Sequence, residues 1–111
     1  MLSPSRGCTI FIAKRPVDFR FGFDRLAHLC KESGGQDPYG GGLFLFFNKS
    51  YTKAKIIYFD GSGSILVWKR LEAGKFRPPV LQGDGSFATI GASDMMLLLE
   101  GTGTPWDPKK K

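Results

Sequence analysis

The chain has 111 residues, which suits one domain with a single modest core, and its 41% hydrophobic content excludes a disordered chain. Its formal net charge of +6 favours a polyanionic partner such as nucleic acid or an anionic membrane surface, although a protein that is merely basic has the same totals. Two cysteines exclude a disulfide framework, and no apolar run has the length that crosses a bilayer. We therefore expect a cytoplasmic protein with free thiols and no membrane partner.

The first third of the chain predicts a strand and an amphipathic helix. Residues 8–13, CTIFIA, are β-branched and aromatic, as in a short strand. Apolar residues then recur at steps of three and four over residues 19–30, which predicts a helix over residues 21–31. Asp18 is a candidate N-cap for an early start, and Gly34-Gly35 ends the helix.

The middle of the chain predicts a three-strand meander. Residues 43–47, LFLFF, are apolar at every position and predict a strand that is covered on both faces. Residues 53–59 and 64–70 alternate apolar and polar side chains, which predicts a hairpin with its turn centred on Gly61-Ser62 or on Asp60-Gly61. Adjacent short strands with short turns favour antiparallel pairing.

The last third of the chain predicts a short strand over residues 87–90 and a short helix over residues 94–100, which Ser93 caps and Gly101 ends. Residues 102–111, TGTPWDPKKK, have no periodicity and predict a loose basic tail. Together the elements predict a single α+β domain over residues 1–101. It has a mainly antiparallel sheet with the three-strand meander at its centre, one amphipathic helix on one face and a short C-terminal helix.

Alternation divides the predicted hairpin into two faces. One face carries three cations and a tryptophan, from Lys53, Lys55, Ile57, Phe59, Leu66, Trp68 and Arg70. The other face carries Ala54, Ile56, Tyr58, Ile65, Val67 and Lys69. Because the second face is mainly aliphatic, we expect the first helix to pack on it.

The cationic face has two interpretations. Lysine stems and a tryptophan can cover apolar surface on a solvated sheet. Alternatively, the cations bind phosphates and the ring stacks on a base. Residues 36–77 carry seven Lys or Arg and three acidic residues, and this local excess favours binding. The candidate DNA-binding residues are Arg20, Arg25, Lys53, Lys55, Trp68, Lys69, Arg70, Lys75 and Arg77.

Four stretches carry a resemblance to a known family. They are VDFRFGFDRLAHL (17–29), DPYGGGLFLFFNK (37–49), KIIYFDGSGSILVWKRLEAGKF (55–76) and DMMLLLEG (94–101). In this order they resemble the small accessory protein, called TnpB, that is encoded by the second reading frame of bacterial insertion sequences of the IS-sixty-six type. The family has a lysine where this chain has Phe21, so a phosphate contact made by that lysine would be absent here.

The resemblance implies a role in DNA transposition beside a separate, larger transposase that carries the carboxylates for strand cutting. The implied partners are DNA, at the element ends or non-specifically, and this transposase. Two functions stay open. One is a non-catalytic accessory that binds DNA, and the other is a protein–protein adaptor for the transposase. The adaptor surface would lie around the aromatic residues Phe44, Phe46, Trp68 and Phe76.

A catalytic function is the least favoured prediction. A metal-dependent nuclease needs two or three acids on a magnesium ion, and a conceivable set is Asp60 and Glu72 with Lys75. The strand between Asp60 and Glu72 separates them by several residues at about 3.3 Å each. The single histidine and the two cysteines lack the paired spacing of zinc ligands. We therefore predict no enzymatic activity, no metal and no cofactor.

Overall fold

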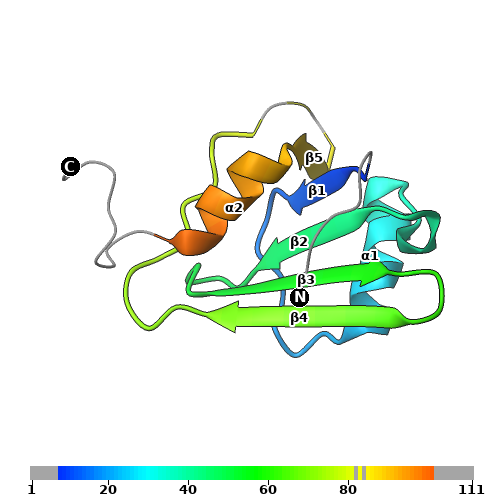
Figure 1. Ribbon diagram of the computed structural model, residues 1–111, viewed down its shortest axis with the longest axis horizontal. Coiled ribbons are helices and arrows are strands. Elements are labelled where there is room, and N and C mark those ends of the chain that lie inside the picture. Colours follow the sequence, from blue (N-terminus) through cyan, green and yellow to red (C-terminus); the bar gives the residue numbers. More distant parts are fainter. Residues whose placement is uncertain (1–7, 82, 84, 102–111) are drawn as a thin grey trace.

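The structure is a computed structural model that describes residues 8–81, 83 and 85–101 of the 111. All strands and helices are labelled in Figure 1 except the short 3-10 helix η1. In chain order they are β1 (Ile10–Ala13), α1 (Phe23–Gly34), η1 (Pro38–Gly40), β2 (Leu43–Phe47), β3 (Lys53–Phe59), β4 (Ser64–Arg70), β5 (Phe87–Ile90) and α2 (Ala92–Glu100). The predicted tail, residues 102–111, lies outside the described residues.

The five strands form one sheet in the order β4-β3-β2-β1-β5. β2, β3 and β4 form the predicted antiparallel meander, and β5 pairs antiparallel with β1. β1 and β2 pair in parallel, because the chain crosses over through α1 between them. The α+β class with a mainly antiparallel sheet is confirmed, and β1–β2 is the parallel pair of this sheet.

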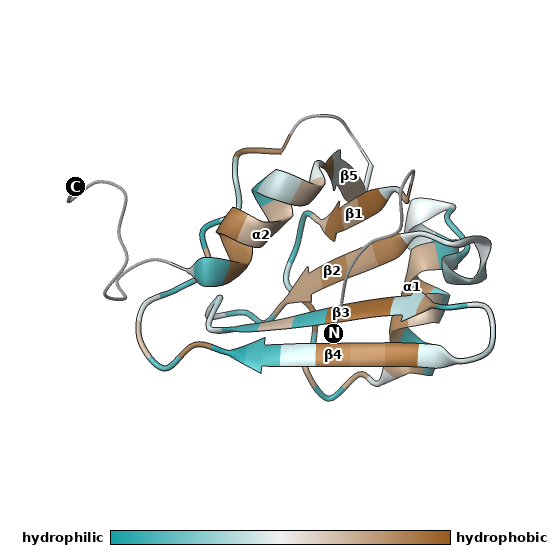
Figure 2. Cartoon of the chain, viewed as in Figure 1, coloured by the Kyte–Doolittle hydropathy of each residue, from teal (hydrophilic) through white to brown (hydrophobic). Residues whose placement is uncertain are grey.

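The two helices cover opposite faces of the sheet (Figure 1). α1 buries Leu26, Ala27 and Cys30 against Phe44 and Phe46 of the central strand. α2 buries Met95 and Leu98 on the other face, where they join a core that includes Leu43, Leu45 and Phe47. Every residue of β2 is buried, as its unbroken apolar run predicts (Figure 2).

The face that α1 covers differs from the prediction. Ile57 of β3 belongs to the α1 core and Leu66 of β4 packs against it, whereas Ala54 and Ile56 belong to the α2 core. The first helix therefore packs on the face that also carries the cations, and the aliphatic face meets the C-terminal helix. Because β2 is apolar on both sides, the sequence pattern does not distinguish its two faces.

The strand bounds follow the sequence more closely than the helix starts do. β2 to β5 have the predicted limits, whereas α1 begins at Phe23 after an extended N-cap at Gly22. α2 begins at Ala92 after Gly91, and neither helix has a side-chain cap. Both helices end at a glycine of positive φ, Gly35 at 64° and Gly101 at 81°, as the glycines predict.

Membrane insertion by a helix finds no support in the fold. No helix within the described residues is long and apolar enough to cross a bilayer.

Candidate nucleic-acid interface

The β3–β4 hairpin fixes the positions of the predicted cations. Lys53 pairs with Arg70, and Lys55 pairs with Trp68, as a turn centred on Gly61-Ser62 requires. The Asp60 carboxylate accepts the backbone N–H groups of Ser62 and Gly63 at 3.0 and 2.9 Å, which closes the turn. The sequence-derived division of the hairpin into two faces is therefore confirmed.

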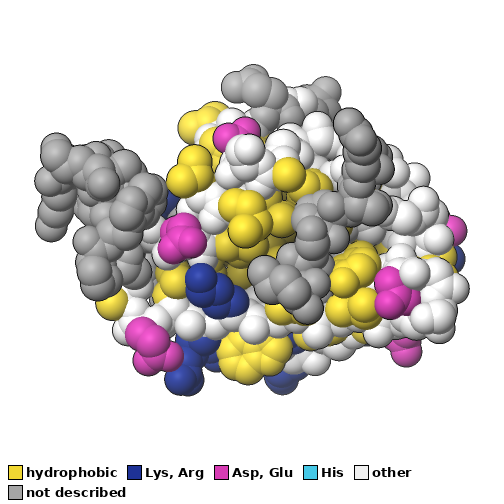
Figure 3. Space-filling model, viewed as in Figure 1, with side chains coloured by type: hydrophobic (Ala, Val, Ile, Leu, Met, Phe, Trp, Pro, Cys, Tyr) yellow, Lys and Arg dark blue, Asp and Glu magenta, His cyan; other side chains and the backbone are white. Residues whose placement is uncertain are grey.

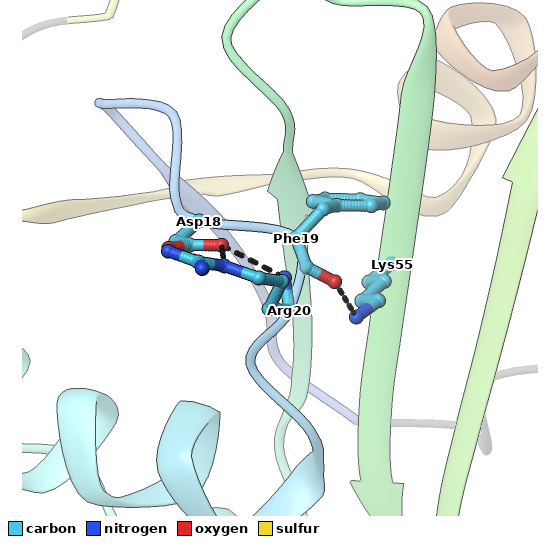
Figure 4. Close-up of polar contacts among 4 residues, drawn as sticks. All are labelled: Asp18, Phe19, Arg20 and Lys55. Atoms are coloured by element: carbon cyan, nitrogen blue, oxygen red, sulfur yellow. Dashed lines mark hydrogen bonds and ion pairs between the residues drawn. The ribbon is translucent and has the colours of Figure 1, made fainter.

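Lys55 has the most constrained side chain among these cations. It is 9% exposed, and its Nζ donates to the carbonyl oxygen of Phe19 at 2.6 Å (Figure 4). The same Nζ donates to the carbonyl oxygen of Phe21 at 2.7 Å. Its ammonium also lies 4.7 Å from the centre of the Phe19 ring. Burial lowers the pKa of Lys55, and the nearby Asp18 carboxylate opposes this effect. Lys55 therefore holds the loop before α1 on the sheet.

The same loop presents Arg20 in a fixed orientation. The Asp18 carboxylate accepts Nε and Nη2 of Arg20 at 3.0 and 2.6 Å and also the Arg20 backbone N–H at 2.9 Å (Figure 4). The hydrogen bonds from the Arg20 side chain lower the pKa of Asp18 to about 2. The Arg20 side chain is 89% exposed, and its Nη1 donors are not used by Asp18.

Beside this loop, the hairpin carries an exposed tryptophan with a lysine near its ring. Trp68 is 54% exposed, and Nζ of Lys53 lies 6.0 Å from its ring centre. The guanidinium of Arg25 lies 4.7 Å from the centre of the Phe21 ring, on the loop that Lys55 holds. We call this group the basic-aromatic surface, and it consists of Arg20, Arg25, Lys53, Trp68 and Arg70.

Of the three remaining predicted residues, Lys69 lies away from this group. Lys69 lies on the opposite face, where its Nζ donates to the Leu99 carbonyl oxygen of α2 at 2.7 Å. Lys75 and Arg77 follow β4 and flank the buried Phe76. The basic-aromatic surface thus contains five of the nine candidates, and Lys55 lies beneath it.

Burial of Lys55 and the role of Phe19 are the features that the sequence analysis missed. Lys55 pairs with the fully buried Phe46 on one side and with Trp68 on the other, so it occupies the middle of a covered sheet. In the sequence, Lys55 alternates with Ala54 and Ile56 as a solvated lysine on a half-buried strand would, so no local signal indicates its burial. The carbonyl oxygens that it contacts come from a distant loop and have no local sequence signature.

The two acidic residues of the conceivable nuclease site, Asp60 and Glu72, do not come together in the fold. Asp60 lies at the turn before β4, and Glu72 lies beyond the other end of the strand, 3.6 Å from Arg70. Asp60 uses its carboxylate to close the turn. Within the described ranges, no three His, Cys, Asp or Glu residues lie close enough to hold a metal ion.

Three of the four aromatic residues of the predicted adaptor surface are core residues. Phe44 and Phe46 are fully buried, and Phe76 is 2% exposed with its ring 5.4 Å from that of Phe47. They cannot form a docking surface in the folded chain, and that prediction was wrong. Trp68 is the exposed member of the set.

Comparisons with known proteins agree with the resemblance found in the sequence. Residues 8–110 match the model of the family described as IS66 Orf2 like protein. The chain is 48% identical over 84 residues to "Uncharacterized protein y4jC" of Sinorhizobium fredii, which covers 75% of this chain and 72% of the relative. It is 37% identical over 101 residues to "Uncharacterized protein y4hO" of the same organism, covering 91% and 86%. No solved structure matches. The chain therefore belongs to the IS66 Orf2-like family of insertion-sequence proteins.

Proposed function

We propose that this protein is a non-catalytic accessory of DNA transposition that binds DNA through the basic-aromatic surface and assists a separate transposase in the cytoplasm. The observation that carries the proposal is the pairing of Lys53 with Arg70 on the face that also carries the exposed Trp68. Lys55, the cross-strand partner of Trp68, holds the loop that presents Arg20. Membership of an insertion-sequence family supports DNA as the polyanion.

The arrangement suits a nucleic-acid backbone. Lys53 and Arg70 are cross-strand partners at the open end of the hairpin, so their charges can reach neighbouring phosphates. Trp68 lies next to them on the same face and offers a flat ring for a base or sugar. The Asp18 carboxylate offsets part of the Arg20 charge but fixes its direction. We therefore expect backbone contacts to dominate, with modest dependence on DNA sequence.

A salt titration tests this function. Fluorescence anisotropy measures binding of the purified protein to a labelled element-end duplex and to a scrambled duplex. Replacing Lys53 and Arg70 with alanine removes two phosphate contacts, so the slope of log affinity against log salt should become less steep by about 1.8, from about 0.9 per phosphate. The expected loss applies equally to both duplexes, because phosphate contacts carry no base information.

Lys31→Ala is the control, because it removes one positive charge, as each of the substitutions of Lys53 and Arg70 does. Lys31 lies at the far end of α1, where it faces the ring of Tyr39, and that ring contacts Phe59 at the opposite end of β3 from Lys53. Its loss should leave the slope within error of the parent. The proposal fails if the parent does not bind either duplex at low salt, or if the double variant keeps the parental slope.

A second candidate function is an adaptor that binds the transposase through α2. Met96 and Leu97 are 52% and 56% exposed on this helix, and Met96 lines a groove of about 220 Å³ between α2 and strands β3 and β4. Figure 3 shows hydrophobic side chains gathered on this face. Exposed apolar side chains on one helix are typical of a protein-binding surface.

Co-purification separates the adaptor from the DNA-binding accessory. In salt that abolishes DNA binding, an adaptor should still retain the transposase, and Leu97→Asp should release it. Ser93→Asp places the same charge on an exposed position in the first turn of α2 and should have no effect. Retention that is equally strong with Leu97→Asp would exclude this surface.

A further inference from the structure

The outer edge of β4 presents backbone groups that have no partner strand among the described residues. β4 ends the sheet, and its paired neighbour is β3. Hydrogen bonds from Asp60 N to Gly63 O and from Leu71 N to Thr52 O bracket the β3–β4 ladder. Because hydrogen-bonded pairs alternate along an antiparallel ladder, odd-numbered residues of β4 bond to β3. The N–H and C=O groups of the even-numbered residues therefore point outward: Ser64, Leu66, Trp68 and Arg70.

This edge has few of the features that protect edge strands. β4 is seven residues long, its register with β3 is unbroken, and it contains no proline. Its middle, Ile65 to Trp68, is largely apolar, and its charges are confined to the C-terminal end (Figure 2). The opposite edge differs, because β5 has four residues and the Pro79–Leu81 segment lies beside it. An open apolar edge of this length favours pairing with another strand.

We propose that β4 pairs antiparallel with β4 of a second copy of this chain, about a two-fold axis at Val67. In this register Ser64 faces Arg70 of the second copy, and Leu66 faces Trp68. All four outward-facing residues of each strand then form hydrogen-bonded pairs, which no other antiparallel register allows. The two sheets become one, and the exposed Trp68 ring lies beside Leu66 of the second copy.

Charge also favours pairing of two identical strands in this orientation. Lys69 and Arg70 lie at one end of β4, and Asp60 lies in the turn before the other end. Antiparallel pairing directs the basic end of each strand toward the acidic turn of its partner, with Asp60 about 13 Å along the strand from the position opposite Arg70. It also keeps the two basic ends about 20 Å apart, at about 3.3 Å per residue. A parallel pair would place the basic ends side by side.

Charged substitutions of Val67, which lies on the proposed two-fold axis, test the register of the β4–β4 pair. Val67 is 37% exposed, and the two copies of its side chain face each other across a non-hydrogen-bonded pair. Val67→Lys and Val67→Glu each place like charges together and should weaken the dimer by at least about tenfold. A one-to-one mixture of the two variants should restore it as a heterodimer. Sedimentation velocity across a concentration series measures all three samples, with far-UV circular dichroism to confirm folding.

Thr89→Lys is the matched control, because Thr89 is an exposed residue of the opposite edge strand. It should sediment like the parent. Hydrogen exchange on the unmodified chain gives an independent measurement, since the outward N–H groups of Leu66 and Trp68 should become protected as concentration rises. A parent that stays monomeric at tens of micromolar, or a dimer unaffected by either Val67 variant, would overturn the proposal.

Discussion

A single lysine determines how the loop before α1 lies on the sheet. The ammonium of Lys55 contacts the carbonyl oxygens of Phe19 and Phe21, and these three residues connect β3 with the segment that leads into the first helix. Sequence reasoning treated Lys55 as one cation among nine candidates. Its burial depends on a contact with residues more than thirty positions earlier, so it could be recognised only once the fold was known.

Replacing Lys55 with methionine tests this structural role. Methionine keeps a long apolar stem but donates no hydrogen bond, so the carbonyl oxygens of Phe19 and Phe21 lose their partner. We expect the free energy of unfolding to fall by about 2 kcal/mol. Urea unfolding followed by far-UV circular dichroism measures the change. Lys31→Met, at an exposed position of α1, should alter stability by less than about 0.5 kcal/mol, and an equal effect of both substitutions would contradict the assigned role.

At the scale of elements, the strands were easier to predict than the placement of the helices. Alternation between the turn residues of the β3–β4 hairpin defined both strands and both faces, because the side-chain period of a strand is a local property. The start of α1 was missed because Phe19 and Phe21 continue the apolar spacing, although they belong to the preceding loop. The face that α1 covers depends on the crossover between β1 and β2, which is not local.

At the C-terminal end of α1, Gly34 lies so close to β5 that adding one methyl group tests the contact. A Cβ at Gly34 would lie 2.5 Å from Cδ2 of Phe87 in β5. The Phe87 ring cannot move aside easily, since it packs edge-on against Phe44 and Phe46, each 5.8 Å away between centroids. Gly34→Ala should therefore destabilise the fold by about 1–3 kcal/mol, despite the gain of up to about 1 kcal/mol that alanine brings to a helix.

Thermal and urea unfolding of Gly34→Ala measure this cost. Gly40→Ala is the control, because no atom lies within 4 Å of the Cβ that would be added there. Its stability should match that of the parent within about 0.5 kcal/mol. If Gly34→Ala leaves stability unchanged or raises it, then Phe87 and β5 shift to make room for the added methyl group.

At the scale of the whole molecule, the fold class and the family were available from the sequence. The order of elements and the four motif stretches were sufficient for both. The basic-aromatic surface was predicted in part, since the hairpin register brings Lys53, Trp68 and Arg70 together without any tertiary information. Arg20 and Arg25 join them through the loop held by Lys55, and Lys69 faces the other way because alternate strand residues face opposite sides.

The position of β1 in the sheet has a consequence for folding during synthesis. β1 stands between β2 and β5, and Ile10 near the start of the chain pairs with Ile90 near its end. The β2-β3-β4 meander can form from neighbouring segments, whereas the β1–β5 ladder must bring residues 10–13 together with residues 87–90. On the ribosome, the sheet therefore stays incomplete until residues 87–90 have emerged. Until then β1 has an unpaired edge, and the apolar face that α2 will cover remains open to solvent.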